Sequence, residues 1–177
     1  MELELRKIES SDVCNSLSLG DEEFTPLKIF LRKEAKKLHQ DNLAVTFVIV
    51  AKGTKRVLAY LTTLCTHIAV EQFDDQKSIS EDFKYKDYPA IKLARLAVDI
   101  SQRDNDLHLG SKLVDFLVGF ATEQVMPYTG CRFLVVDAKP KSVGFYIKKG
   151  FSKIGDHQEG QSQATTMVID LGRLPKF

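Results

Sequence analysis

The sequence has few cysteines and histidines, and neither residue type occurs at the spacing of a metal site. Cys14, Cys65 and Cys131 lie far apart, are odd in number and include no CxxC pair, so we expect neither a disulfide framework nor a thiolate zinc site. The four histidines show no HExxH or comparable spacing, and we predict no bound metal. Long apolar runs are also lacking, since nothing approaches the roughly 18 consecutive apolar residues of a membrane span.

An excess of charge of one sign is missing too, because 25 Lys and Arg residues stand against 24 Asp and Glu residues. This balance excludes a protein whose whole surface binds nucleic acid, and it leaves room for a regional basic stripe. Residues 1–7 alternate charge and leucine, which indicates a strand rather than a secretory signal. We expect a soluble, cytoplasmic protein that contacts no membrane, and at 177 residues a single domain, 1–177.

Periodicity and turn residues divide the chain into helices and strands. Thr25 and Pro26 predict a capped helix that runs to about His39 and carries a basic outer face. The further predicted elements are an antiparallel hairpin of 43–51 and 56–70, a polar insertion at 71–86, a strand at 91–99, a helix at 109–125, a strand at 132–136, a helix at 141–149 ended by Gly150, and strands at 151–154 and 165–171. This order predicts a mixed α/β sheet in which strands 91–99 and 132–136 are parallel.

The most informative stretch is a strand ending at Asp99, a polar loop, and Leu109-Gly110-Ser111 at the head of an amphipathic helix. Backbone N–H groups at a helix start have no partner within the helix and carry the positive end of its dipole. A strand that leads a loop to such a helix start builds an anion-binding turn. Together with Asp137-Ala138 and the later Gly144-Phe145-Tyr146 and Gly150-Phe151, this stretch points to an acyl-coenzyme A enzyme.

Four segments, Leu96–Asp99, Leu109–Ser111, Val136–Ala138 and Phe145–Phe151, together resemble the GNAT superfamily of N-acetyltransferases. The resemblance spans most of the chain. It implies a mixed central sheet of about seven strands, flanking helices, a splayed central parallel pair, and acetyl-CoA as the acetyl-donor cosubstrate. Two further stretches are similar to the acetyltransferase toxins of bacterial toxin–antitoxin pairs: Phe30–Ala35 followed by Thr46-Phe47, and Tyr88–Asp99.

By this resemblance, the backbone of Leu96, Ala97 and Val98 binds the pantetheine amides of acetyl-CoA. An amide-rich ligand can complete the ladder of an unpaired strand edge as an added strand would. By itself the triplet fits an ordinary buried strand equally well.

The pyrophosphate loop of the family allows two registers here. Aligned on Gly110, the chain has Asn105 where the family has Gln or Arg, and His108 where it has its first glycine; the other register uses Arg103 and two inserted residues. Because it stands in place of glycine, His108 either adopts a right-handed backbone conformation or displaces the cofactor slightly. Its side chain either donates a hydrogen bond to a phosphate or is a solvent-exposed part of the loop. The amides expected to bind phosphate belong to Leu107, His108, Leu109, Gly110 and Ser111.

Tyr146 is the predicted catalytic residue, because the family places in this helix a tyrosine that protonates the departing thiolate of coenzyme A. The alternative is that its ring only packs against the pantetheine arm. No general base stands out; Asp99, Glu71, Asp74 and Asp75 are candidates by position only. An α-amine with a pKa near 8 needs less help in losing its proton than a lysine, so an α-amine acceptor is favoured.

The toxin-like stretches imply acetylation of the α-amine of aminoacyl-tRNA and an antitoxin protein as partner. The resemblance to the wider family, in which dimers are common, implies a homodimer. One helix face would then grip RNA, although a solvated face explains it as well; that face consists of Lys28, Arg32, Lys33, Lys36 and Lys37. The alternatives are an acetyltransferase of a small amine or protein amine, and a catalytically silent acyl-CoA-binding module.

Overall fold

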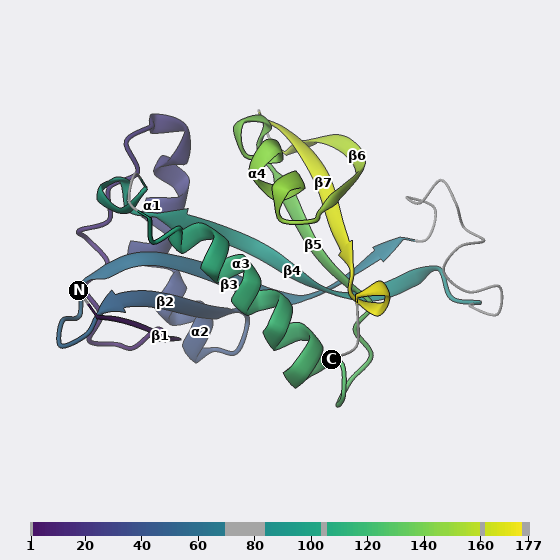
Figure 1. The fold of residues 1–177 in the computed structure, drawn as a ribbon, viewed down its shortest axis with the longest axis horizontal. Helices are drawn as coiled ribbons and strands as arrows, with labels where there is room; N and C mark the ends of the chain where they lie inside the picture. The colour runs from purple at the N-terminus through teal and green to yellow at the C-terminus, as the bar shows by residue number, and fades with distance from the viewer. Residues whose placement is uncertain (1, 70–83, 104–105, 160–161, 175–177) are drawn as a thin grey trace. The chain divides into compact units, whose positions relative to one another are not determined.

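The structure, a computed structural model, describes residues 2–69, 84–103, 106–159 and 162–174. Its elements are β1 (Leu3–Lys7), α1 (Thr25–Lys33), α2 (Ala35–Gln40), β2 (Val45–Ala51), β3 (Val57–Ala69), β4 (Asp87–Val98), α3 (Leu109–Phe120), β5 (Phe133–Ala138), α4 (Val143–Lys148), β6 (Ser152–Glu159) and β7 (Ser162–Asp170) (Figure 1). The strands form a seven-stranded sheet in the order β1-β2-β3-β4-β5-β7-β6. The predicted mixed α/β class and strand number are therefore confirmed.

The strand ladders have the predicted directions. β2 pairs antiparallel with β3, from Val45↔Thr63 to Val50↔Val57, which confirms the early hairpin. β4 pairs parallel with β5, from Ala90↔Phe133 to Lys92↔Val135, which confirms the parallel central pair. Antiparallel ladders join β1 to β2 and β7 to both β5 and β6. Among the described residues, no helix has the length and apolar character to cross a membrane.

The chain folds into two compact units, and each is described by itself. The first unit contains residues 1–64 and 93–114, and the second contains residues 65–92 and 115–177. β3, β4 and α3 each contribute residues to both units.

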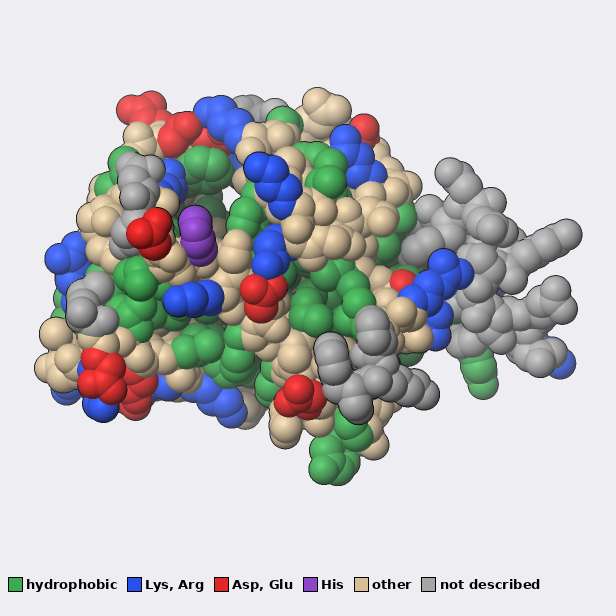
Figure 2. Space-filling view, viewed as in Figure 1, with side chains coloured by type: hydrophobic (Ala, Val, Ile, Leu, Met, Phe, Trp, Pro, Cys, Tyr) green, Lys and Arg blue, Asp and Glu red, His purple; other side chains and the backbone are tan. Residues whose placement is uncertain are grey.

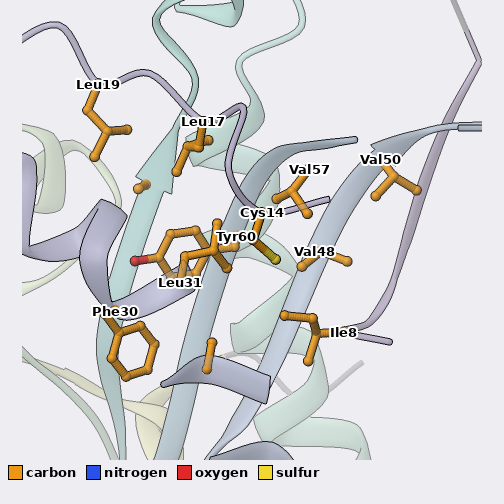
Figure 3. Packing of buried hydrophobic residues seen from close by; sticks show 12 residues of the cluster. Ile8, Cys14, Leu17, Leu19, Phe30, Leu31, Val48, Val50, Val57 and Tyr60 are labelled. Atoms are coloured by element: carbon orange, nitrogen blue, oxygen red, sulfur yellow. The ribbon is translucent and has the colours of Figure 1, made fainter. Parts of the chain in front are cut away.

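The core of the first unit lies under α1, where apolar residues recur at helical spacing. Figure 3 shows Leu31 of α1 and Tyr60 of β3 among the side chains of this cluster, and both are fully buried. The Tyr60 hydroxyl donates to the Leu27 carbonyl at 2.7 Å, so the polar end of a buried aromatic ring is paired. Phe30 stacks on Tyr60 with ring centroids 6.4 Å apart. Burial of a side chain of this size stabilises the fold by about 1.5 to 3 kcal/mol.

The second unit has its own apolar cluster, to which β4, β5 and β7 all contribute. Tyr88 and Phe133 meet edge to face with ring centroids 5.5 Å apart. The remaining buried members are Ile68, Ala90, Val135 and Val168. Main-chain bonds fasten the ends of these strands, since the Arg132 amide donates to the Pro89 carbonyl at 2.8 Å and the Leu171 amide donates to the Arg132 carbonyl at 3.0 Å.

The predicted helix from Thr25 to His39 is wrong in two respects. It is two helices, because Glu34, at φ −119°, interrupts the helical geometry between α1 and α2. Thr25 is also not a side-chain cap; the Asp21 carboxylate instead accepts from the Glu23 amide at 3.0 Å and caps a short 3-10 turn, Glu22–Phe24, that leads into α1. The acidic cap therefore lies four residues upstream of the predicted one.

Three strand boundaries also differ from the prediction. β4 begins at Asp87, four residues early, because the Pro89 carbonyl accepts from Arg132 and proline needs to donate nothing there. β6 and β7 extend into the stretch expected to be a polar connection from both sides, with Gln158 paired to Gln163. The predicted helix 109–125 ends in a π-helical turn, Ala121–Val125. Gly150, at φ +87°, ends α4 in the expected left-handed conformation.

Candidate functional site

The end of β4 carries the three residues predicted to bind pantetheine. Ala97 is buried in the core of the first unit, while Leu96 and Val98 are half-buried. Arg103 folds back onto this strand end, where its Nε donates to the Val98 carbonyl at 3.3 Å and its guanidinium lies 5.8 Å from the centroid of the Phe24 ring. The structure thus brings together two of the predicted cofactor-binding residues, Arg103 and Val98.

The first turn of α3 offers the amides expected at the diphosphate. The first intrahelical bond runs from the Lys112 amide to the His108 carbonyl at 3.1 Å, so the amides of Leu109, Gly110 and Ser111 precede it. Leu109 is buried and fixes the rotation of the helix, while Gly110 and Ser111 are half-buried. These residues fit a phosphate group, because a helix start presents unbonded donors and a positive dipole end to an anion.

His108 has a φ of +46°, in the left-handed region. The first of the two alternatives for His108, a right-handed conformation, is wrong, since this histidine takes the backbone geometry for which glycine is the usual residue. Its side chain is exposed, and Leu107 before it is half-buried. Asn105, which occupies the Gln or Arg position in one register, lies outside the described residues, as do the base candidates Glu71, Asp74 and Asp75.

Asp99, the remaining candidate for the general base, uses its carboxylate to hold the surrounding chain in place through hydrogen bonds. Its carboxylate accepts hydrogen bonds from the Ser18 amide at 2.9 Å, the Ser101 amide at 3.0 Å and the Ser101 hydroxyl at 2.6 Å. Burial raises the pKa of this carboxyl, but the hydrogen bonds from Ser101 and Ser18 outweigh burial and lower the pKa below its usual value. A carboxylate that is buried and bonded in this way is poorly placed to take a proton from an amine.

Tyr146 lies on α4 in the second unit and is only 6% exposed. Its ring meets those of Phe145 and Phe151 edge to face, with centroid distances of 5.1 and 5.3 Å. Within the described residues, no protein group hydrogen-bonds to its hydroxyl. Burial raises the pKa of this phenol above its ordinary value, so the group keeps its proton at neutral pH. A protonated phenol is the form that a general acid needs.

The second unit also contains a polar cluster that the sequence did not predict. Asp137 of β5 forms an ion pair with Lys92 of β4 and accepts a hydrogen bond from the Thr166 hydroxyl at 2.8 Å. His157 Nδ1 lies 3.2 Å from the Thr166 hydroxyl and its Nε2 lies 3.9 Å from Asp137. Burial raises the pKa of Asp137, but Lys92 and Thr166 lower it overall. The missing signal was strand register, because Lys92 and Asp137 meet only once β4 and β5 are paired.

The cations on the basic face of α1 and α2 form two groups: some have a hydrogen-bond or ion-pair partner, and the others have none among the described residues. Lys36 Nζ donates to the carbonyls of Ser10 and Asp12, at 2.8 Å each, and Lys37 pairs with Asp41 at 2.7 Å. The side chains with no such partner among the described residues are Lys28, Arg32 and Lys33. On the face drawn in Figure 2, Lys and Arg side chains are interspersed with Asp and Glu side chains. Among the described residues, no group of three or more His, Cys, Asp or Glu side chains is arranged to hold a metal ion.

No protein-family model matches the sequence, and no curated protein is similar to it. Solved structures, however, are similar over almost the whole chain. AtaT complexed with acetyl-methionyl-tRNAfMet is 20% identical, with 93% of this chain and 94% of that chain covered and a TM-score of 0.75. A tyrosine-to-phenylalanine mutant of the toxin AtaT, bound to the C-terminus of the antitoxin AtaR and acetyl-CoA, is 18% identical, with 96% and 94% covered and a TM-score of 0.72. A tyrosine-to-phenylalanine mutant of KacT is 21% identical, with 97% and 96% covered and a TM-score of 0.74. These likenesses show that the chain shares the fold of these proteins, which is the GNAT fold that its motifs predicted.

Proposed function

We propose that this GNAT-fold chain is an acetyl-CoA-dependent N-acetyltransferase that acetylates a primary amine in the cytoplasm, and that its acceptor is the α-amine of aminoacyl-tRNA. The observation that carries this proposal is the likeness, over 93% of the chain, to a structure of AtaT complexed with acetyl-methionyl-tRNAfMet. The amides at the start of α3 and the protonated phenol of Tyr146 support it, because acetyl transfer from coenzyme A needs an anion site and an acid. An antitoxin protein is the proposed partner, as AtaR is for AtaT.

Different residues have separate roles in the direct transfer of the acetyl group within a ternary complex. The amides of Leu109 to Ser111 hold the diphosphate, and the backbone of Leu96 to Val98 aligns the pantetheine arm. Acetyl-CoA, when bound, supplies an acetyl group as a thioester. The acceptor nitrogen forms the new bond to the carbonyl carbon, the carbon–sulfur bond breaks, and the Tyr146 phenol gives its proton to the departing sulfur. The proton lost by the amine passes to solvent, and solvent returns a proton to the Tyr146 phenolate. An α-amine with a pKa near 8 needs no strong base for this.

The test is transfer of radiolabelled acetyl groups to charged tRNA, polyamines and peptides, compared side by side. Charged tRNA should be acetylated in preference to the others, and its kcat/KM should fall steeply with added salt because phosphate contacts release counterions. Preferred labelling of a polyamine or peptide, with little salt dependence, would instead identify an acetyltransferase of small or protein amines. A protein that binds acetyl-CoA but labels no acceptor would be the silent binding module.

The exposed cation Arg32 of α1 allows a sharper version of this test. Arg32→Glu should lower kcat/KM for charged tRNA about tenfold and reduce the salt slope by about one, as expected for the loss of one phosphate contact. Lys55→Glu is the matched control, because Lys55 is also exposed and the charge change is the same, but it lies in the turn between β2 and β3. Equal effects of the two substitutions would show that overall charge, and not this helix face, attracts the tRNA.

A further inference from the structure

Asp99 is a buried carboxylate at the point where β4 ends and the predicted diphosphate loop begins. It is 1% exposed, and three N–H or O–H groups donate to it from Ser18 and Ser101. Arg56 contributes charge from farther away, with Nη2 3.9 Å from Oδ2 and a side chain that is half exposed. Removing a carboxylate from water is costly unless hydrogen bonds replace the lost hydration, and here they do.

The bonds of Asp99 belong to a joint between three parts of the first unit. While its side chain accepts from the Ser18 amide, the next amide, that of Ile100, donates back to the Ser18 carbonyl at 2.7 Å. The Asp99 amide donates to the Leu58 carbonyl of β3 at 2.8 Å. Gly20 closes the joint, because at φ +72° it leaves space that the tip of Ile100 occupies; a Cβ there would lie 2.3 Å from Ile100 Cδ1. The segment before α1 and β3 thus both hold the first residues of the loop.

The Asp99 side chain also shapes the loop itself. By accepting from the Ser101 amide, it caps the 3-10 turn Ile100–Gln102 and turns the chain away from the direction of β4. The turn is followed directly by Arg103, whose Nε returns to the Val98 carbonyl. At the other end of the loop, the His108 carbonyl is fixed by the Lys112 amide. The start of the loop is therefore set by one carboxylate and its end by the first turn of α3.

We propose that Asp99 is a positioning residue for acetyl-CoA: it fixes residues 100–103, the start of the loop that leads to the amides at the start of α3. This inference rests on the proposed function, because it assumes that those amides hold the diphosphate. Asp99 itself contacts no part of the cofactor; it acts through Ser18, Ser101 and the 3-10 turn. Its loss changes cofactor affinity and leaves the transfer step intact.

Asp12 provides a matched control within the same unit. It is 4% exposed and also accepts three hydrogen bonds, two from the Arg6 guanidinium at 2.9 and 2.6 Å and one from the Glu9 amide at 2.8 Å. Its side-chain contacts join β1 to the turn that follows, and among the described residues none of them reaches 99–103 or 106–111. Asp12→Asn therefore imposes a comparable loss of buried carboxylate bonding without disturbing the loop.

The experiment compares wild type, Asp99→Asn and Asp12→Asn by calorimetric titration with coenzyme A and by steady-state kinetics. Asparagine at 99 replaces one acceptor oxygen with an NH2 group that faces the amide donors. We expect Kd for coenzyme A and KM for acetyl-CoA to rise about tenfold, the effect of a lost hydrogen bond to a charged group, with kcat and the KM of the acceptor within about twofold of wild type. Asp12→Asn should lower the melting temperature similarly and leave Kd unchanged.

Equal increases in Kd for the two variants would overturn the proposal, because Asp99 would then only stabilise the fold. If Asp99→Asn does not fold, Ser101→Ala answers the same question, since it removes one 2.6 Å donor from an exposed residue. It should raise Kd about threefold, and an unchanged Kd would refute the positioning role. A wild-type chain that binds no coenzyme A would refute the proposed function itself, and the inference with it.

Discussion

Replacing Tyr146 with phenylalanine separates the chemical role of this residue from its packing role. The ring would stay in place, because its edge-to-face contacts with Phe145 and Phe151 involve only carbon atoms of the ring. The hydroxyl has no protein hydrogen-bond partner among the described residues, so its removal leaves no donor or acceptor unpaired. The free energy of unfolding should therefore change by less than about 0.5 kcal/mol, the usual range for a substitution that breaks no such feature.

The rate should respond very differently. A positioned general acid contributes about 10²- to 10⁴-fold, which corresponds to roughly 3 to 5 kcal/mol of transition-state stabilisation. We expect kcat to fall by this factor while Kd for acetyl-CoA changes less than about twofold, because the phenol acts on the departing sulfur and not on the bound ground state.

Tyr60→Phe is the matched control for Tyr146→Phe. Tyr60 is also a buried tyrosine, but its hydroxyl donates to the Leu27 carbonyl. Its loss should cost about 1 kcal/mol of stability without lowering kcat. Urea unfolding, calorimetric titration and steady-state acetyl transfer measure the three quantities. If Tyr146→Phe kept full turnover, the acid would have to be another group, and Tyr146 would be a packing residue.

Three further predictions concern pH and stability. Because burial raises the pKa of Tyr146, kcat/KM with an α-amine acceptor should rise to about pH 8 and stay level to about pH 10; a decline within that range would contradict an acid of raised pKa. Asp137→Asn should lower the unfolding free energy at pH 7 by about 1 to 3 kcal/mol. The folded-state pKa of Asp137 is lowered, so this contribution to stability is present above about pH 4 and is lost as the pH falls through the folded-state pKa. If urea unfolding gave the same difference in unfolding free energy between wild type and Asp137→Asn at pH 7 and at pH 3, the pairing with Lys92 would be refuted. Gly20→Ala should lower the free energy of unfolding by about 1 to 2 kcal/mol, because alanine is strained in a left-handed backbone conformation, and by a smaller amount because its Cβ displaces Ile100. In a double-mutant cycle, Ile100→Ala should recover only the smaller of these two contributions.

Local patterns in the sequence were sufficient to predict the order and direction of the strands. The hairpin of β2 and β3 and the parallel pair of β4 and β5 follow from apolar periodicity and from the helix placed between the latter two strands. The polar stretch before β7 was misjudged because its pairing is antiparallel at an exposed hairpin, where no apolar alternation marks a strand. The cap of α1 was misplaced because Thr25 and Asp21 are both good cap residues, and sequence alone does not choose between them.

The candidate site was predictable where it depends on the backbone and unpredictable where it depends on distant contacts. The start of α3 at Leu109 and the position of Tyr146 on α4 follow from local spacing. The bond between Asp99 and Ser18 joins residues 81 positions apart, and the pair of Lys92 and Asp137 depends on strand register. One local signal was overlooked: an aspartate two residues before Ser101 is the pattern of a side chain that caps its own turn.

The left-handed backbone of His108 has a consequence for how other chains with this fold can be recognised from their sequences. At this place in the loop the backbone has a positive φ. Glycine adopts a positive φ at the lowest energetic cost, although histidine, asparagine and aspartate also reach the left-handed region. A search pattern that specifies residue types discards chains in which a residue other than glycine has this positive φ. A pattern written in dihedral angles, strand followed by turn, one left-handed residue and then helix, would retain them.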